Sequence, residues 1–254
     1  MKQDLSLIGV GLYSPAEAAA LTHIPSPKIR RWLRGHVIGG REYPRLWTSR
    51  LEKLDVESLY LSFLDLVQLR VAHAFIREGL SPQKVRRAIE YGAEIVSSDY
   101  PFASARFRTD GKTLILHVLD EESGDDRLID LFKHGQYLMQ KVIEPSLKGL
   151  EFEGDIAARW WPLGRAKGIV IDPRRQFGQP IDDATGVPTS VLAQAAQAEG
   201  SAAQAAKLFI VPIRSVNRAV AFELQLLHIA RFCGMPRRPC STEWSPSPAR
   251  SLYA

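Results

Sequence analysis

Two closely spaced helix-start signals near the N-terminus constrain the fold of this chain more than any other sequence feature. Ser14-Pro15-Ala16-Glu17 combines an N-cap serine, a proline at the first helical position and a glutamate that completes a capping box. Ile24-Pro25 stops this helix within a few residues, and Ser26-Pro27 starts the next one, which ends at Gly35. Two short helices joined by a tight turn form a helix-turn-helix.

The second helix, within residues 26–35, separates apolar from basic side chains. Ile29 and Trp32 recur at helical spacing and predict the side that packs on the first helix. The cations that are left to face outward are Lys28, Arg30, Arg31 and Arg34. Arginine and lysine are the residue types with which a recognition helix reaches phosphates and base edges in the major groove. A surface of solvated charges is the alternative interpretation.

A basic hairpin is predicted directly after this helix. Residues 36–50, HVIGGREYPRLWTSR, hold a Gly39-Gly40 turn between short β-prone runs, which is typical of a wing. Because two adjacent basic elements indicate one ligand, they favour nucleic acid over a solvated face. The candidate DNA-binding residues are therefore Lys28, Arg30, Arg31, Arg34, Arg41 and Arg45.

The net charge of +5 is unevenly distributed along the 254 residues. Residues 1–50 carry a net +5, residues 228–254 a net +3, and the residues between them a net −3. Clustered positive charge is typical of a protein with a polyanionic partner. No apolar run approaches the roughly 18 residues of a membrane-spanning helix. Because there is no secretory signal pattern and Cys233 and Cys240 are the only cysteines, we expect a cytoplasmic protein.

Two further helices complete a predicted first domain, residues 1–96. The cap signature at Ser62-Phe63-Leu64-Asp65 opens one helix, which Gly79 closes, and Ser81-Pro82 opens another that runs to about Val96. The apolar face of the first of these helices is wide. A wide face predicts burial on two sides, with a dimer partner as one candidate for the second covering surface.

Residues 97–160 are predicted to form a connecting region that contains a β-hairpin. Asp110-Gly111 separates residues 105–109 from the β-prone run at 112–118, and Asp-Gly is a preferred two-residue hairpin turn. We therefore expect Gly111 to have a positive φ, where any other residue would strain the turn. Residues 127–148 are expected to be mainly helical.

A C-terminal module is predicted over residues 161–227. Residues 168–173 form a short buried strand that ends at Asp-Pro, and turns follow. Three alanine-rich helices come next, which makes a second, helix-turn-helix-like unit at residues 189–199, 202–209 and 214–227. The fold class is thus α+β and mainly α. Residues 228–254 are rich in proline and serine and are expected to form a basic flexible tail.

Catalytic and metal-binding patterns are absent from the sequence. It has no phosphate-binding loop, no Gly-x-Ser-x-Gly and no His-Glu-x-x-His. The spacing of His228, Cys233 and Cys240 matches no common zinc pattern. The acid pairs Asp125-Asp126 and Asp182-Asp183 are expected to be solvated loop residues. We therefore predict a protein that is not an enzyme and needs no metal or cofactor.

The two modules resemble known families. Residues from about 12 to 96 resemble a MerR-like winged helix-turn-helix domain, on YSPAEAAALTHIPSPKIRRWLRG, the wing, and the pair SFLDLVQLR…REGLSPQKVRRAIEYG. No effector-binding cysteine cluster or long dimerising coiled coil follows it. Residues 168–222 resemble the small domain of unknown function in VapB-type antitoxins, on IVIDPRRQFGQPIDDATGVPTSVL and EGSAAQAAKLFIVPIRSVNRAVAFE. In their order, the modules are similar to a subgroup of these antitoxins.

The resemblance implies a function in a toxin-antitoxin system. Such proteins bind and block a PIN-domain ribonuclease toxin, and they repress their own operon as dimers on palindromic DNA. Because PIN active sites hold acids around a divalent metal, the basic tail is a candidate inhibitor with Arg231, Arg237, Arg238 and Arg250. A tail without any partner is the alternative. For the whole chain, the alternative is a stand-alone MerR-like transcriptional regulator with an unknown ligand.

Overall fold

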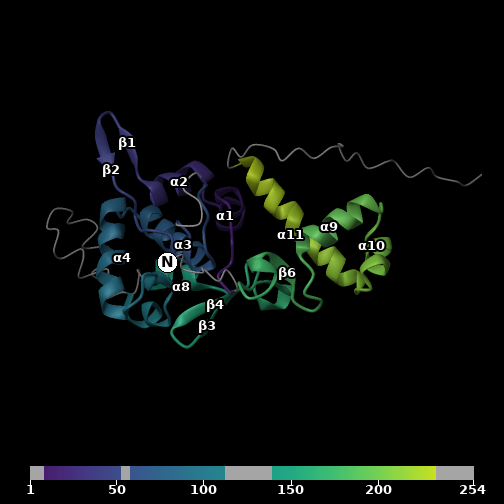
Figure 1. Ribbon diagram of the computed structural model, residues 1–254. Coiled ribbons are helices and arrows are strands. Elements are labelled where there is room, and N and C mark those ends of the chain that lie inside the picture. Colours follow the sequence, from purple (N-terminus) through teal and green to yellow (C-terminus); the bar gives the residue numbers. More distant parts are fainter. Residues whose placement is uncertain (1–8, 53–57, 112–138, 233–254) are drawn as a thin grey trace, which may run out of the picture.

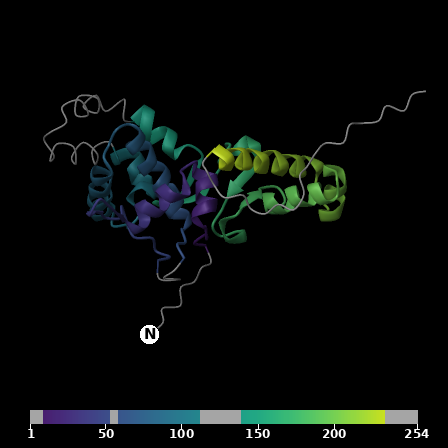
Figure 2. The same cartoon turned by 90° about the horizontal axis from the view of Figure 1, so that it is seen from above.

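The computed structural model describes residues 9–52, 58–111 and 139–232 of the protein. Helices dominate this part of the chain, and two small antiparallel sheets complete an α+β fold. Figures 1 and 2 show an elongated molecule with the N-terminal helical body at one end and the C-terminal helices at the other. The α+β, mainly helical class predicted from the sequence is confirmed.

The two N-terminal helices begin where the sequence signals predict. Helix α1 (Pro15–Thr22) has the full capping box, and a three-residue turn leads to α2 (Ser26–Arg34). Strands β1 (His36–Ile38) and β2 (Arg41–Tyr43) then form an isolated antiparallel hairpin. It projects from the helical body beside α2 (Figure 1). The expected basic hairpin is therefore present.

Helix α3 (Phe63–Arg77) lies at the centre of the N-terminal body. Ser62 caps it, every residue from Phe63 to Leu69 is buried, and Phe75 is buried as well. Its neighbours are α1, α4 (Pro82–Val96), the short 3-10 helix at Pro101–Ala103 and helix α8 (Glu144–Leu147). The wide apolar face of α3 is thus covered by this chain itself rather than by a dimer partner.

The hairpin predicted around Asp110-Gly111 is wrong. Residues 105–111 are helical, and Gly111 is not among the glycines with positive φ. Ser104 Oγ accepts a hydrogen bond from the backbone N–H of Phe107, 3.2 Å away, at the start of this helix. Phe107 is buried with its ring centroid 4.7 Å from that of Phe102. Burial of an aromatic side chain outweighs a local turn preference. Residues 112–118 lie outside the described residues.

A four-stranded antiparallel sheet connects the two ends of the molecule. A π-helix (Met139–Ile143) and α8 lead into β3 (Leu150–Glu153) and β4 (Ile156–Trp160). Strands β5 (Ile169–Ile171) and β6 (Pro180–Asp182) complete the order β3-β4-β5-β6. Strands β3 and β4 belong to the predicted connecting region, residues 97–160, and β5 and β6 belong to the predicted C-terminal module. The two predicted regions therefore share one sheet. The buried strand predicted within residues 168–173 is confirmed.

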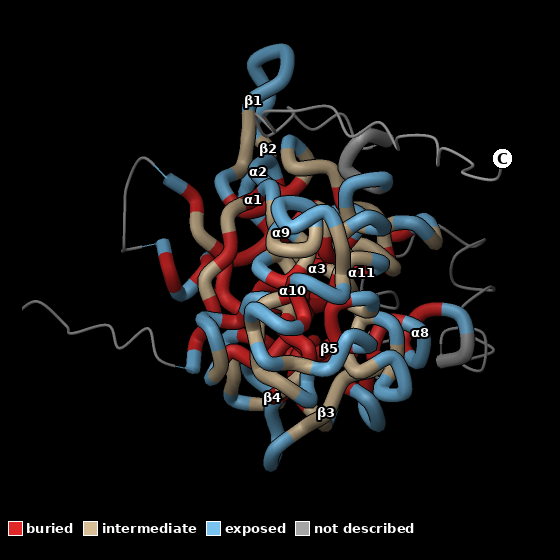
Figure 3. Tube along the Cα trace, turned by 90° about the vertical axis from the view of Figure 1, so that its right-hand side faces the viewer, coloured by how far each residue is buried: buried red, intermediate tan, exposed pale blue. Residues whose placement is uncertain are grey.

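The two faces of this sheet contribute to different cores. Ile169 and Ile171 join the main hydrophobic core of the N-terminal body, whereas Val170 packs with Trp161 and Ile181 in a small separate cluster. All three residues of β5 are buried, and Figure 3 shows this strand beside other buried segments, drawn in red, in the interior of the molecule. Tyr13 reinforces the connection, because its buried hydroxyl donates to the carbonyl of Gly178 over 2.7 Å. The sheet is therefore packed against the N-terminal body.

Three helices end the described chain. They are α9 (Thr189–Ala198), α10 (Ala202–Phe209) and α11 (Ile213–Phe232), and they enclose a small core around Leu192, Ala205 and Val216. The three-helix unit is therefore confirmed, although α11 continues to Phe232 instead of ending at Leu227. Short 3-10 turns at Arg165–Lys167 and Gln176–Gly178 flank β5.

Candidate functional site

The exposed side of α2 forms the first part of a candidate nucleic-acid interface. Ile29, Trp32 and Leu33 point into the main core. The exposed side carries three of the predicted residues, Arg30, Arg31 and Arg34. Proline at the first turn and the preceding αL residue, His23, set the angle at which α2 leaves α1.

Lys28 lies at the edge of this face and is half-buried. Its Nζ lies 4.8 Å from the centroid of the Trp32 ring, a distance typical of a cation–π contact. Burial, followed by the charge of Arg31, lowers the pKa of Lys28. Trp32 is therefore a core residue, as predicted, that also supports a cation at the surface.

The β1–β2 hairpin forms the second part of the interface. Its turn residues Gly39 and Gly40 have φ of 57° and 78°, values that glycine adopts without strain. The rings of His36 and Tyr43 stack with centroids 4.9 Å apart, and the guanidinium of Arg41 lies 5.5 Å from the Tyr43 ring. Arg41 is thus exposed on the hairpin, and the stacked rings of His36 and Tyr43 support its side chain.

Arg45, another candidate DNA-binding residue, forms an ion pair within the chain. Its Nη1 lies 2.5 Å from Oε1 of Glu52, and both side chains are about half exposed. An intramolecular acid partner compensates much of the charge of Arg45. Binding to phosphate through Arg45 would require this pair to separate.

Sequence reasoning missed two residues that join this surface. A cavity of about 420 Å³ lies between α2, the hairpin and the start of α4, and its basic and aromatic lining includes Lys28, Arg31, His36, Tyr43 and Arg86. Arg86 could not be found from local patterns, because no sequence signal shows that α4 packs beside α2. His36 lies in the predicted hairpin segment, residues 36–50, so its position was a signal that could have found it. The structure thus gathers cations from two helices next to the hairpin.

A partly buried histidine lies behind the cations of this surface. The ring of His73 on α3 lies 6.0 Å from that of Trp32. Burial, followed by the charges of Lys28 and Arg77, lowers the pKa of His73 to about 4. Burial is therefore the main cause of the neutral imidazole, and the neighbouring cations add to it.

A buried carboxylate holds the segment after the hairpin against α3. Asp65 Oδ1 accepts a hydrogen bond from Nε1 of Trp47 over 2.8 Å, and Oδ2 accepts from Ser49 Oγ over 2.7 Å. The same carboxylate completes the cap with the N–H and hydroxyl of Ser62, each at 2.8 Å. Burial raises the pKa of Asp65, and these hydrogen bonds oppose the rise. Asp65 thus fixes the segment of Trp47 and Ser49, which follows the hairpin, although its own side chain is buried and cannot contact a ligand of the interface.

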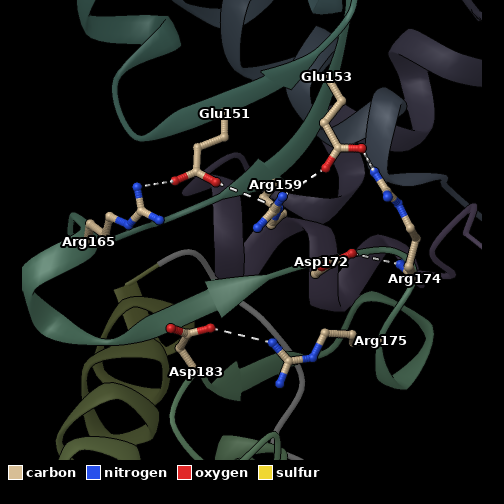
Figure 4. Close-up of polar contacts among 8 residues, drawn as sticks. All are labelled: Glu151, Glu153, Arg159, Arg165, Asp172, Arg174, Arg175 and Asp183. Atoms are coloured by element: carbon tan, nitrogen blue, oxygen red, sulfur yellow. Dashed lines mark hydrogen bonds and ion pairs between the residues drawn. The ribbon is translucent and has the colours of Figure 1, made fainter.

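A second charged surface lies on the sheet and the loop after β5 (Figure 4). Arg159 lies between two acids, with Nη2 2.8 Å from Glu153 and Nε 3.6 Å from Glu151. Glu153 also accepts a hydrogen bond from Arg174, and hydrogen bonds from these two arginines lower its pKa. The outer pairs of this network are Arg165 with Glu151 at 3.1 Å and Arg175 with Asp183 at 3.4 Å.

The charges of this sheet surface largely compensate one another. Each labelled arginine in Figure 4 has an acidic partner within the chain. An external carboxylate would have to compete with these partners. Arg214, at the start of α11, is exposed and forms no ion pair with a described residue, so it is more available.

The prediction that Asp182 is a solvated loop acid is wrong. Asp182 is fully buried, and its Oδ1 accepts a hydrogen bond from Nη2 of Arg218 on α11. Its Oδ2 accepts from the hydroxyl of Thr185 over 3.0 Å. Asp182 therefore ties the end of β6 to α11. Asp183 is exposed, as predicted, whereas Asp125 and Asp126 lie outside the described residues.

The predicted tail residues cannot be placed in the same way. Arg231 belongs to the last turn of α11, but its side chain is outside the described part, as are Arg237, Arg238 and Arg250. Among the described residues, no group of three or more His, Cys, Asp or Glu side chains is arranged to hold a metal ion. Within the same ranges, none of the helices has the length and apolar character needed to span a membrane.

The chain is similar to a mycobacterial protein. It is 28% identical over 199 residues to a protein of Mycobacterium tuberculosis described as "Putative antitoxin VapB45", and the match covers 73% of this chain and 82% of that protein. No family model matches the chain. The similarity supports the resemblance to VapB-type antitoxins.

The fold is also similar to a crystal structure. The structure of Rv2018 from Mycobacterium tuberculosis superposes with a TM-score of 0.60 at 23% identity and covers 84% of this chain and 99% of that one. This likeness shows the fold of the chain.

Proposed function

We propose that this protein is an antitoxin that inhibits a PIN-domain ribonuclease toxin and represses its own operon. The observation that carries the proposal is the 28% identity with the protein described as an antitoxin, over 73% of this chain. The basic α2 and hairpin surface supports the DNA-binding part of the proposal. A protein of this class needs no catalytic residue, metal or cofactor.

The DNA-binding part uses residues 1–96 as a MerR-like winged helix-turn-helix. Helix α2 enters the major groove, where arginines read guanine edges or hold phosphate, while Lys28, Arg41 and Arg45 contact the backbone. A dimer places two such helices about 34 Å apart, one turn of DNA, on a palindromic operator.

The toxin-binding part uses the C-terminal module, residues 161–227, and the basic tail, residues 228–254. Arginine forks bind carboxylates bidentately, so the tail residues can occupy the acidic metal site of a PIN toxin. The residues proposed for this contact are Arg231, Arg237, Arg238 and Arg250. Arg214 is the next candidate, because it is exposed and lacks an acidic partner among the described residues.

Titration of the toxin's ribonuclease activity tests the tail. The toxin is a PIN-domain protein sought in the reading frames next to this gene, and the chain is used at full length and truncated after Phe232, where α11 ends. Because a charge-assisted hydrogen bond contributes about 1.5–3 kcal/mol, loss of three tail arginines should weaken inhibition at least tenfold. Operator binding should stay unchanged. Equal inhibition by both forms would move the inhibitory surface to the module itself.

A further inference from the structure

The turn between α10 and α11 carries the most exposed of the large apolar side chains that the structure describes. Ile210 is 92% exposed, and its neighbours Leu208 and Ile213 are 63% and 49% exposed. We refer to these three residues as the tip. Figures 1 and 2 show α10, which this turn follows, at the end of the molecule opposite the N-terminal body. The tip is therefore well separated from the α2 and hairpin surface.

Ile210 also has a backbone conformation that isoleucine rarely adopts. Its φ of 53° and ψ of 45° lie in the left-handed region, where glycine or asparagine usually ends a helix. Of the five described non-glycine residues with positive φ, Ile210 is the one with a β-branched side chain, which makes it an outlier. Ile210 therefore lowers the stability of the fold in two ways, by its exposed apolar surface and by its strained backbone.

Packing within the fold does not explain an isoleucine at this position. Phe209 and Val211, on either side of it, are the residues that pack against the small core of the C-terminal helices. The turn is closed by backbone hydrogen bonds, from the N–H of Ile210 to the carbonyl of Lys207 and from that of Val211 to the carbonyl of Ala206. Asparagine or glycine would form the same bonds. Positions that break local rules without a structural gain are commonly functional.

Cations border the tip, and acids are absent from this part of the sequence. Lys207 and Arg214 are exposed, and neither forms an ion pair with a described residue. Residues 200–222 contain no aspartate or glutamate. An apolar centre with a basic rim is complementary to a protein surface that has an apolar pocket bordered by carboxylates.

The helix pair α10–α11 repeats the pattern of α1–α2 without its DNA-facing charges. Both first helices have eight residues, a serine cap and a C-cap residue in the αL conformation, and Ile210 takes the place of His23. In the same alignment, Ser215, Asn217 and Ala221 replace Lys28, Arg30 and Arg34. Arg218 takes the place of Arg31, but it binds the buried Asp182. The second pair is thus poorly suited to a nucleic acid, which favours a protein partner.

We propose that Ile210 is the apolar anchor with which this chain binds its toxin. Ile210 enters an apolar pocket of the toxin, with Leu208 and Ile213 beside it, while Lys207 and Arg214 face carboxylates at the rim of that pocket. A single apolar side chain in a desolvated pocket with a polar rim is typical of a binding hot spot. The short turn holds Ile210 in place before binding, so little conformational entropy is lost. The inference rests on the proposed function for the identity of the partner.

Ile210→Asn separates binding from folding. Asparagine is polar and tolerates the left-handed region, so the variant should melt at the same temperature as the wild type or up to about 4 °C higher. Its Kd for the purified PIN-domain protein should rise at least about 30-fold, the effect of losing a hot spot. Leu224→Asn, at a position 60% exposed further along α11, is the matched control and should bind like the wild type.

Reversal of the two cations tests the rim separately. The variant that combines Lys207→Glu and Arg214→Glu should associate with the PIN-domain protein at least about tenfold more slowly at low salt, because opposite charges steer association. Association of the wild type should slow as salt is added. Equal association rates for the wild type and the reversed variant would exclude a carboxylate-bordered pocket and overturn the proposal.

The outcomes distinguish this inference from the antitoxin proposal. Toxin binding by the wild type with equal binding by Ile210→Asn, or with equal losses in Ile210→Asn and Leu224→Asn, would overturn the inference alone. A wild type that binds no toxin would overturn both. A lower melting temperature of Ile210→Asn would show a structural role instead. Loss of operator binding by this variant, or a changed mass of the chain alone in analytical ultracentrifugation, would assign the tip to DNA or to a second copy and would also overturn the inference.

Discussion

Simultaneous replacement of Arg30, Arg31 and Arg34 with alanine is expected to abolish specific binding to the operator. The three side chains are exposed on α2, while the apolar side of the same helix is buried, so their removal should leave the fold intact. A good bidentate contact to a base contributes about 1–3 kcal/mol of discrimination. Loss of three contacts should therefore lower the affinity more than 100-fold, by about 3 kcal/mol or more.

Fluorescence anisotropy on an operator duplex measures this effect at several salt concentrations. Each lost phosphate contact should also reduce the slope of log K against log salt by about one unit. The control variant combines Arg165→Ala, Lys167→Ala and Lys207→Ala, which removes the same charge from exposed positions of the C-terminal half. Unchanged operator binding by the α2 variant, or equal losses in both variants, would exclude α2 as the recognition helix.

Asp65→Ala is expected to cause the largest loss of stability among single substitutions. The change leaves the indole of Trp47 and the backbone N–H of Ser62 without their acceptor inside the core, whereas the hydroxyl of Ser49 keeps the carbonyl of Tyr60, 3.2 Å away. Each buried donor without a partner costs about 1–3 kcal/mol. The free energy of unfolding should therefore fall by about 3 kcal/mol or more, a large part of the stability of a typical domain.

Urea denaturation followed by circular dichroism measures this loss. Ser81→Ala is the matched control, because it removes only the cap of α4 and should cost about 1 kcal/mol. Asp65→Asn should fall between the two, since an amide keeps one acceptor oxygen. A loss from Asp65→Ala no larger than that from Ser81→Ala would contradict the role given to the carboxylate.

Much of the helical fold follows from local signals that have a physical mechanism. Ser14, Ser62 and Ser81 each accept a hydrogen bond from the third residue of the helix they start, as the sequence predicts. The starts of α1, α3 and α4 were therefore predictable. The same holds for the β1–β2 turn, because two adjacent glycines are suited to positive φ.

Long-range packing explains why other parts of the fold were not predictable. The Asp110-Gly111 signal is local, whereas the helix at residues 105–111 depends on Phe107 reaching Phe102 and Phe75 in the core. Asp182 looked like a loop acid because Arg218, its partner, lies 36 residues further along the chain. Sequence spacing carries no information about such contacts.

The sequence predicts which cations the candidate site contains, but it does not predict which other side chains these cations contact. The outward placement of Arg30 and Arg31 follows from the period of Ile29 and Trp32 on α2. The pairing of Arg45 with Glu52 and the approach of Arg86 require the tertiary structure. Residue type therefore predicts candidate contacts, and packing decides which of them are available.

Growth of cells that express a PIN-domain protein from a reading frame next to this gene tests the antitoxin proposal most directly. That protein alone should arrest growth, and co-expression of this chain should restore growth. The triple α2 variant should restore growth as well, because inhibition is assigned to the C-terminal half and not to DNA binding. Continued arrest while the full-length chain accumulates in soluble, folded form would contradict the proposal that this protein is the antitoxin of that toxin.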